Sequence, residues 1–84
     1  MIVVVFTQDN CSWCNKALNL LHQHSYEFQV LNISKRDGKK QQHHKEHLNN
    51  IAPEAKTVPQ IFIDGKHIGG YEELKEYFND HIKN

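Results

Sequence analysis

The sequence contains few of the residues that mark several protein classes. Of its 84 residues, two are cysteine, two are proline and four are glycine, and ten basic residues balance ten acidic ones. Two cysteines are too few for the disulfide framework of a small secreted domain. The balanced charge indicates neither a nucleic-acid partner nor an anionic membrane surface. No apolar run approaches the roughly 20 residues of a membrane span, so we expect a soluble, cytoplasmic protein.

The apolar residues that are present follow a pattern of alternating strands and helices. Residues 2–6 form a short apolar run typical of a buried strand. The further predicted elements are a helix over 12–24, a strand over 26–33, a polar helix from about 39 to Pro53, strands over 60–63 and 66–68, and a helix from 71. This order predicts one α/β domain over residues 1–84, with a four-stranded mixed sheet flanked by three helices.

Several short polar sequences are predicted to cap or join these elements. Asp64 and Gly65 are typical of a two-residue hairpin turn. Asp9 and Asn10 are good candidates for the N-terminal cap of the first helix. Ser34 with Asp37 fits a capping pair for the polar helix.

Both cysteines lie in residues 11–14 (Cys-Ser-Trp-Cys), between the first strand and the first helix. The free N–H groups and the positive dipole of the helix terminus stabilise a thiolate, so we expect the pKa of Cys11 to lie below its usual value of about 8.5. Cys14, one turn later on the apolar face, is placed to attack a mixed disulfide on Cys11. Cys11 is therefore the predicted nucleophile and Cys14 the resolving thiol. A purely structural disulfide is disfavoured, because such a short bridge closes almost no loop.

Two more segments have sequences suited to binding a peptide. Residues 57–59 (Thr-Val-Pro) precede the third strand. A cis bond before Pro59 would leave the Val58 backbone free for an extended ligand, although the sequence supports such a bond only at the ordinary frequency for proline. Residues 69–73 (Gly-Gly-Tyr-Glu-Glu) open the last helix, whose tip can hold a carboxylate. Taken singly, residues 57–59 are more simply interpreted as an ordinary strand junction, and residues 69–73 as a flexible joint.

Taken together, residues 11–14, 57–63 and 67–74 resemble the three signature segments of glutaredoxins, in the same order and spacing. The resemblance covers nearly the whole chain and is weakest over residues 38–50. It implies a thioredoxin-like fold and a monomer without a metal. It also implies that glutathione drives the reduction of protein disulfides and glutathionylated proteins. Ribonucleotide reductase is a protein substrate that the family suggests.

The resemblance also assigns glutathione-binding residues. These are Trp13 beside the sulfur, Lys56 near a carboxylate, Thr57, Val58 and Pro59 as a backbone clamp, and Gly70, Tyr71 and Glu72 at the helix tip. Three positions depart from the family pattern. Ser12 replaces the usual proline, Glu72 replaces an aspartate, and Gln8 stands near the place where many members carry a lysine. These departures predict an altered redox poise and a weaker charge contact to glutathione.

Alternative interpretations of the sequence remain. Some glutaredoxins with a serine after the first cysteine bind an iron–sulfur cluster between two subunits, and Ser12 fits that pattern. A thioredoxin-like protein reduced by a flavoprotein is a weaker alternative, because residues 69–72 favour glutathione. His43 and His47 lie four positions apart, but their separation from the cysteines does not match zinc-finger spacing, which favours solvent-exposed histidines.

Overall fold

The computed structural model of the protein describes residues 1–34 and 39–82, without the side chains of 39–42 and 81–82. The elements are β1 (Val3–Thr7), α1 (Ser12–Gln23), β2 (Gln29–Asn32), α2 (Lys39–Ile51), β3 (Gln60–Ile63), β4 (Lys66–Gly69) and α3 (Tyr71–Ile82). The predicted order of strands and helices is confirmed. Within the described part of the chain, no helix has the length and apolar character needed to span a membrane.

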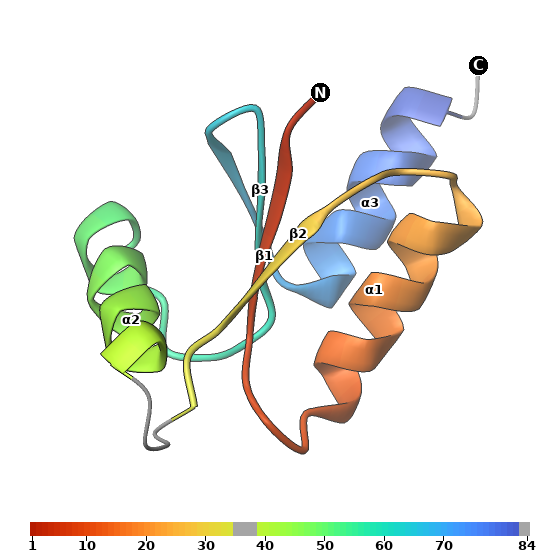
Figure 1. Ribbon diagram of the computed structural model, residues 1–84. Coiled ribbons are helices and arrows are strands. Elements are labelled where there is room, and N and C mark those ends of the chain that lie inside the picture. Colours follow the sequence, from red (N-terminus) through yellow and green to blue (C-terminus); the bar gives the residue numbers. More distant parts are fainter. Residues whose placement is uncertain (35–38, 83–84) are drawn as a thin grey trace.

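The strands form one mixed sheet in the order β2-β1-β3-β4. β1 pairs with β2 in parallel and with β3 in antiparallel orientation, and β3 pairs with β4 in antiparallel orientation. Helices α1 and α3 lie together on one face of the sheet, while α2 lies on the other face (Figure 1). This arrangement confirms the predicted thioredoxin-like fold and places the start of α1 at one end of the sheet.

The turn between β3 and β4 has the predicted hairpin chemistry. Asp64 and Gly65 both adopt positive φ angles, of 50° and 81°. Two consecutive left-handed residues are typical of the type I′ turn, whose twist matches that of the paired strands.

The second strand is shorter than its sequence pattern indicates. The prediction of a strand over 26–33 is wrong at its N-terminal end, because β2 begins only at Gln29. Tyr26 and Phe28 instead turn their rings toward the α1–α3 core, in the connection that follows the helix. Their alternation with polar residues reflects packing against helices rather than strand pairing.

The core divides into two apolar clusters, one on each face of the sheet. The larger cluster lies under α1 and α3 and consists of Val3, Val5, Ala17, Leu21, Ile61, Ile63, Leu74 and Phe78. The smaller cluster lies under α2 and consists of Phe6, Leu48, Ala52 and Phe62. Of the two large aliphatic side chains on α2, Leu48 is buried, whereas Ile51 is 45% exposed. The capping pair predicted for Ser34 and Asp37 lies partly outside the described residues.

Candidate active site

The first helix begins directly at the cysteine pair. Cys11 and Cys14 are joined by a disulfide, with their Cα atoms 5.3 Å apart. Cys14 is 2% exposed and lies on the buried face of α1, whereas Cys11 is half-buried at the tip of the helix. A partner in solution can therefore reach the sulfur of Cys11 much more easily than that of Cys14.

Cys11 itself caps the N-terminus of α1. Its backbone is extended, with φ −113° and ψ 102°, and its sulfur accepts a hydrogen bond of 3.1 Å from the backbone N–H of Cys14. An N–H group directed at sulfur stabilises a thiolate more than a neutral thiol. The helix terminus therefore favours the reactive form of Cys11 after the disulfide is reduced.

The prediction that Asp9 or Asn10 caps this helix is wrong. Asn10 adopts a positive φ of 55° and so forms the turn that precedes Cys11. The carboxylate of Asp9 accepts a hydrogen bond of 3.0 Å from the side chain of Asn32. The Asp9 backbone N–H also donates to Ser34 at 2.6 Å. Asp9 thus joins the active-site loop to the end of β2.

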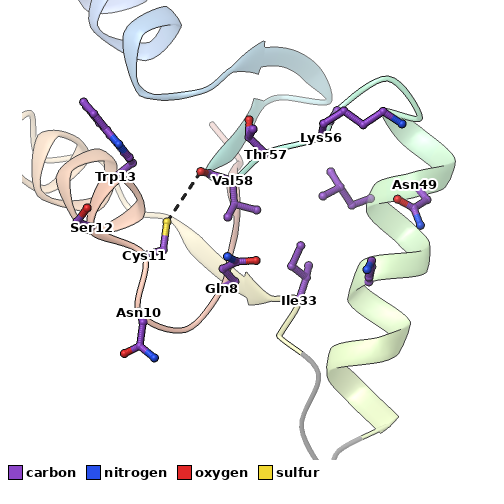
Figure 2. A pocket seen from close by; sticks show the side chains of 13 residues that line it. Gln8, Asn10, Cys11, Ser12, Trp13, Ile33, Asn49, Lys56, Thr57 and Val58 are labelled. Atoms are coloured by element: carbon purple, nitrogen blue, oxygen red, sulfur yellow. Dashed lines mark hydrogen bonds between the residues drawn. The ribbon is translucent and has the colours of Figure 1, made fainter.

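The loop before β3 lies across from Cys11. The bond between Val58 and Pro59 is cis, so the ordinary expectation of a trans bond was wrong here. The carbonyl oxygen of Val58 lies 3.9 Å from the sulfur of Cys11, as the dashed line in Figure 2 shows. Pro59 is buried, Val58 is half-buried and Thr57 is exposed. The backbone at 57–58 therefore lies beside the accessible sulfur.

A cleft of about 500 Å³ opens between Cys11 and α2. Side chains from the active-site loop, the 55–58 segment and α2 surround it (Figure 2). Its lining residues are Gln8, Asn10, Cys11, Ser12, Trp13, Ile33, Lys45, Leu48, Asn49, Ala55, Lys56, Thr57 and Val58. The residues that border the cleft therefore include both the reactive Cys11 and two cationic side chains.

Those cations are Lys45 on α2 and Lys56 on the following loop. Lys56 was among the residues singled out from the sequence, whereas Lys45 was missed. A signal for Lys45 did exist, because Lys45 precedes the buried Leu48 by three positions and Asn49 by four. Residues at this spacing share one side of a helix. Both lysines are exposed, so they offer solvated positive charge to an anionic ligand.

The tip of α3 reaches the same region from the other side. The rings of Trp13 and Tyr71 lie 5.7 Å apart, and the ammonium of Lys16 lies 4.3 Å from the centre of the Trp13 ring. A Cβ atom added to Gly70 would lie 3.5 Å from the carbonyl oxygen of Pro59. The three signature segments therefore meet around Cys11.

The helix tip is itself capped by an acidic side chain. The carboxylate of Glu73 accepts a hydrogen bond of 2.8 Å from the N–H of Gly70. Gly69 has a φ of 121°, and a Cβ atom there would lie 2.8 Å from Cγ of Glu73. Glycine at position 69 is thus required by both the backbone conformation and the space available. Glu72 is exposed at the same terminus.

The two histidines of α2 that were singled out from the sequence, His43 and His47, are both exposed, as predicted. His44 is half-buried, with Nδ1 at 3.1 Å from the carbonyl oxygen of Asn32. The ring of His47 packs edge-on against Phe6, with 5.6 Å between ring centres. Among the described residues, no group of three or more histidine, cysteine or acidic side chains is suited to hold a metal ion.

Comparison with known proteins agrees with this geometry. A family model described as glutaredoxin matches residues 3–68. The chain is also 36% identical over 72 residues to glutaredoxin 3 of Escherichia coli, and the match covers 86% of this chain and 80% of that protein. The chain belongs to the glutaredoxin family. The Cys11–Cys14 pair is thus the redox-active disulfide of a thiol–disulfide oxidoreductase.

Other similar proteins differ in size or carry a ligand. The chain is 35% identical over 77 residues to a hybrid peroxiredoxin of Haemophilus influenzae, and the match covers 90% of this chain but 29% of that protein. A crystal structure of a buckwheat glutaredoxin–glutathione complex matches with a TM-score of 0.76 and 28% identity, covering 93% of this chain and 68% of that chain. The glutaredoxin fold thus extends over nearly all of the present chain.

Proposed function

We propose that this glutaredoxin reduces protein disulfides and glutathionylated proteins in the cytoplasm, with glutathione as the reductant. The main support is the cleft that extends from the Cys11 sulfur past the 57–58 backbone to Lys45 and Lys56. Glutathione is an extended tripeptide with one thiol and a carboxylate at each end, so a sulfur, a free backbone and nearby cations match its chemistry.

Each part of the tripeptide has a proposed position. The glutathione sulfur lies at Cys11 beside Trp13, and the cysteinyl backbone pairs with Val58. The glycine carboxylate faces Lys45 and Lys56. The γ-glutamyl end lies at the tip of α3, where its carboxylate meets the N–H groups near Tyr71 and its ammonium meets Glu72. Gly70 and Pro59 allow the helix tip and the clamp loop to approach each other.

The proposed reaction is a sequence of thiol–disulfide exchanges. The Cys11 thiolate attacks one sulfur of the substrate disulfide, and the other sulfur leaves as a thiolate that takes up a proton. Cys14 then attacks the mixed disulfide on Cys11, which forms the Cys11–Cys14 disulfide and releases the second substrate thiol. Two glutathione molecules restore the dithiol and leave as oxidised glutathione. With a glutathionylated substrate, glutathione can instead resolve Cys11 directly.

A coupled assay tests this proposal. Reduction of a glutathionylated peptide is measured with glutathione, glutathione reductase and NADPH, and compared with reduction driven by thioredoxin reductase. We expect rapid turnover with glutathione and little with the flavoprotein. Comparable or faster turnover with thioredoxin reductase alone would contradict the proposal.

The iron–sulfur alternative remains a prediction with its own test. Cys11 is the more exposed of the two cysteines, so Cys11 and the thiol of bound glutathione are the groups that would hold a cluster between two subunits. Ser12, exposed beside Cys11, leaves space at the helix tip. Anaerobic reconstitution with iron and sulfide would give a coloured dimer if this alternative is correct, and a colourless monomer if it is wrong.

A further inference from the structure

Behind the 57–58 backbone, a buried side chain connects the clamp loop to β4. Gln60 is the first residue of β3 and is 7% exposed. Its Nε2 donates a hydrogen bond of 2.9 Å to the carbonyl oxygen of Thr57. Its Oε1 lies 2.7 Å from Nε2 of His67. One amide thus links the loop that faces the cleft to a strand at the edge of the sheet.

The chemistry of these contacts determines where the protons lie. The carbonyl oxygen of Thr57 can only accept, so the NH₂ group of Gln60 must face it and Oε1 must face His67. Because Oε1 also only accepts, His67 must carry a proton on Nε2. The neutral Nε2–H tautomer and the imidazolium ion both meet this condition. The hydrogen bond therefore persists whether or not His67 takes up a second proton.

The His67 ring is also held by packing. It stacks on Phe62 with 4.6 Å between ring centres and 16° between ring planes. A carboxylate oxygen of Glu54 lies 3.9 Å from Nδ1 of His67, but the Glu54 side chain is 72% exposed. Such a solvated contact contributes little. The ring is thus oriented mainly by Phe62 and Gln60.

Fixing the Thr57 carbonyl also fixes the Val58 amide. The C=O of Thr57 and the N–H of Val58 belong to one planar peptide unit and point in opposite directions when that bond is trans. In the described chain, the Val58–Pro59 bond is the cis bond, so the unit before it is trans. With its carbonyl directed inward to Gln60, this unit directs the Val58 N–H outward.

We propose that Gln60 and His67 are positioning residues, which aim the Val58 N–H at the cysteinyl backbone of glutathione bound beside Cys11. This inference rests on the proposed use of glutathione. It adds two residues that touch no substrate and that act through the orientation of one peptide unit.

A matched pair of substitutions at His67 tests the kinetic consequence. His67→Phe keeps a ring on Phe62 and removes the donor, whereas His67→Gln supplies an amide N–H near the position of Nε2. We expect His67→Phe to raise KM for a glutathionylated peptide about three- to tenfold, as loss of one hydrogen bond implies, with kcat changed less than twofold. His67→Gln should restore most of the wild-type KM. Glu54→Gln serves as the control and should leave KM unchanged.

Nitrogen-15 NMR of the wild-type protein tests the same arrangement without any substrate. We expect a protonated Nε2 on neutral His67 and a Gln60 NH₂ group protected from exchange, with the protection lost in His67→Phe and kept in His67→Gln. A neutral Nδ1–H tautomer, or an unchanged KM in His67→Phe, would overturn the inference. A wild-type protein that is inactive with glutathione would instead overturn the proposed function, and the NMR result would still report on the hydrogen bonds.

Discussion

The two faces of the sheet differ in how firmly their helices are attached. Helices α1 and α3 cover the larger apolar cluster, and the reactive cysteines sit at the start of α1. Helix α2 is attached to the smaller cluster mainly through Leu48, and most of its described side chains are exposed. In Figure 1 these helices stand on opposite sides of the strands. The well-packed face thus holds the thiol chemistry, while the lightly attached face supplies a wall of the cleft.

The largest expected effect of a substitution concerns the two sulfurs of the well-packed face. Cys11→Ser should abolish turnover of every substrate, because it removes the accessible nucleophile. Cys14→Ser should retain turnover of glutathionylated peptides, since glutathione can resolve Cys11, but lose reduction of protein disulfides that need both thiols. The glutathione-coupled assay with both substrate types measures these effects. Retained activity in Cys11→Ser would show that the nucleophile is assigned wrongly.

The next effect compares the anchoring of the two helical faces. Leu21 of α1 is fully buried, and Leu48 of α2 is 4% exposed. Substitution of a buried leucine by alanine costs about 2–5 kcal/mol, and we expect Leu21→Ala near the top of that range and Leu48→Ala near the bottom. Urea denaturation followed by circular dichroism measures both free energies of unfolding. A larger loss of unfolding free energy in Leu48→Ala than in Leu21→Ala would show that α2 is the more firmly anchored helix.

A smaller effect is expected from the cations that border the cleft. Lys45→Ala and Lys56→Ala should each raise KM for glutathione about two- to fivefold, because exposed charge contacts contribute up to about 1 kcal/mol. Added salt should reduce the difference from the wild type. Lys66→Ala is the matched control, since Lys66 is exposed on β4 and does not line the cleft. If all three substitutions raise KM equally, the effect comes from net charge rather than from the cleft.

The smallest expected effect is on how the stability of the protein depends on pH, through Tyr26, which packs against the larger apolar cluster. Burial, with a further contribution from nearby Tyr77, raises the pKa of Tyr26 above its usual value of 10.0. Folding therefore favours the protonated phenol, and this contribution is complete below pH 10.0 and lost as the pH rises through the higher folded-state pKa. Because Tyr26→Phe has no phenol to ionise, its free energy of unfolding should fall less than that of the wild type as the pH rises above 10.0. Melting temperatures measured over this pH range test the prediction. The same pH dependence in Tyr26→Phe and in the wild type would contradict the raised pKa of Tyr26.

The sequence predicted the elements that are governed by local chemistry. The Asp64–Gly65 turn, the inward position of Cys14 and the order of strands and helices all follow from residue type and spacing. Capping was harder to predict, because a cysteine caps α1 while Asp9 bonds to the distant Asn32. The cis bond before Pro59 was also missed, because the sequence of a strand junction does not report how its backbone packs.

Residues that only the fold brings together were the hardest to find. Gln60 and His67 are seven positions apart and are brought together by pairing of β3 with β4. Lys45 required a decision on which side of a weakly amphipathic helix faces the protein. In both cases the residue type is common, and only its place in the fold indicates a role.

The most direct test of the account is a structure of the Cys14→Ser variant bearing glutathione as a mixed disulfide. We expect the tripeptide to be attached to Cys11 and to lie in the cleft, with its cysteinyl backbone paired to Val58 and its glycine carboxylate beside Lys45 and Lys56. Its γ-glutamyl end should lie at the start of α3. A tripeptide that leaves the cleft empty, or that makes no contact with the Val58 backbone, would contradict the account.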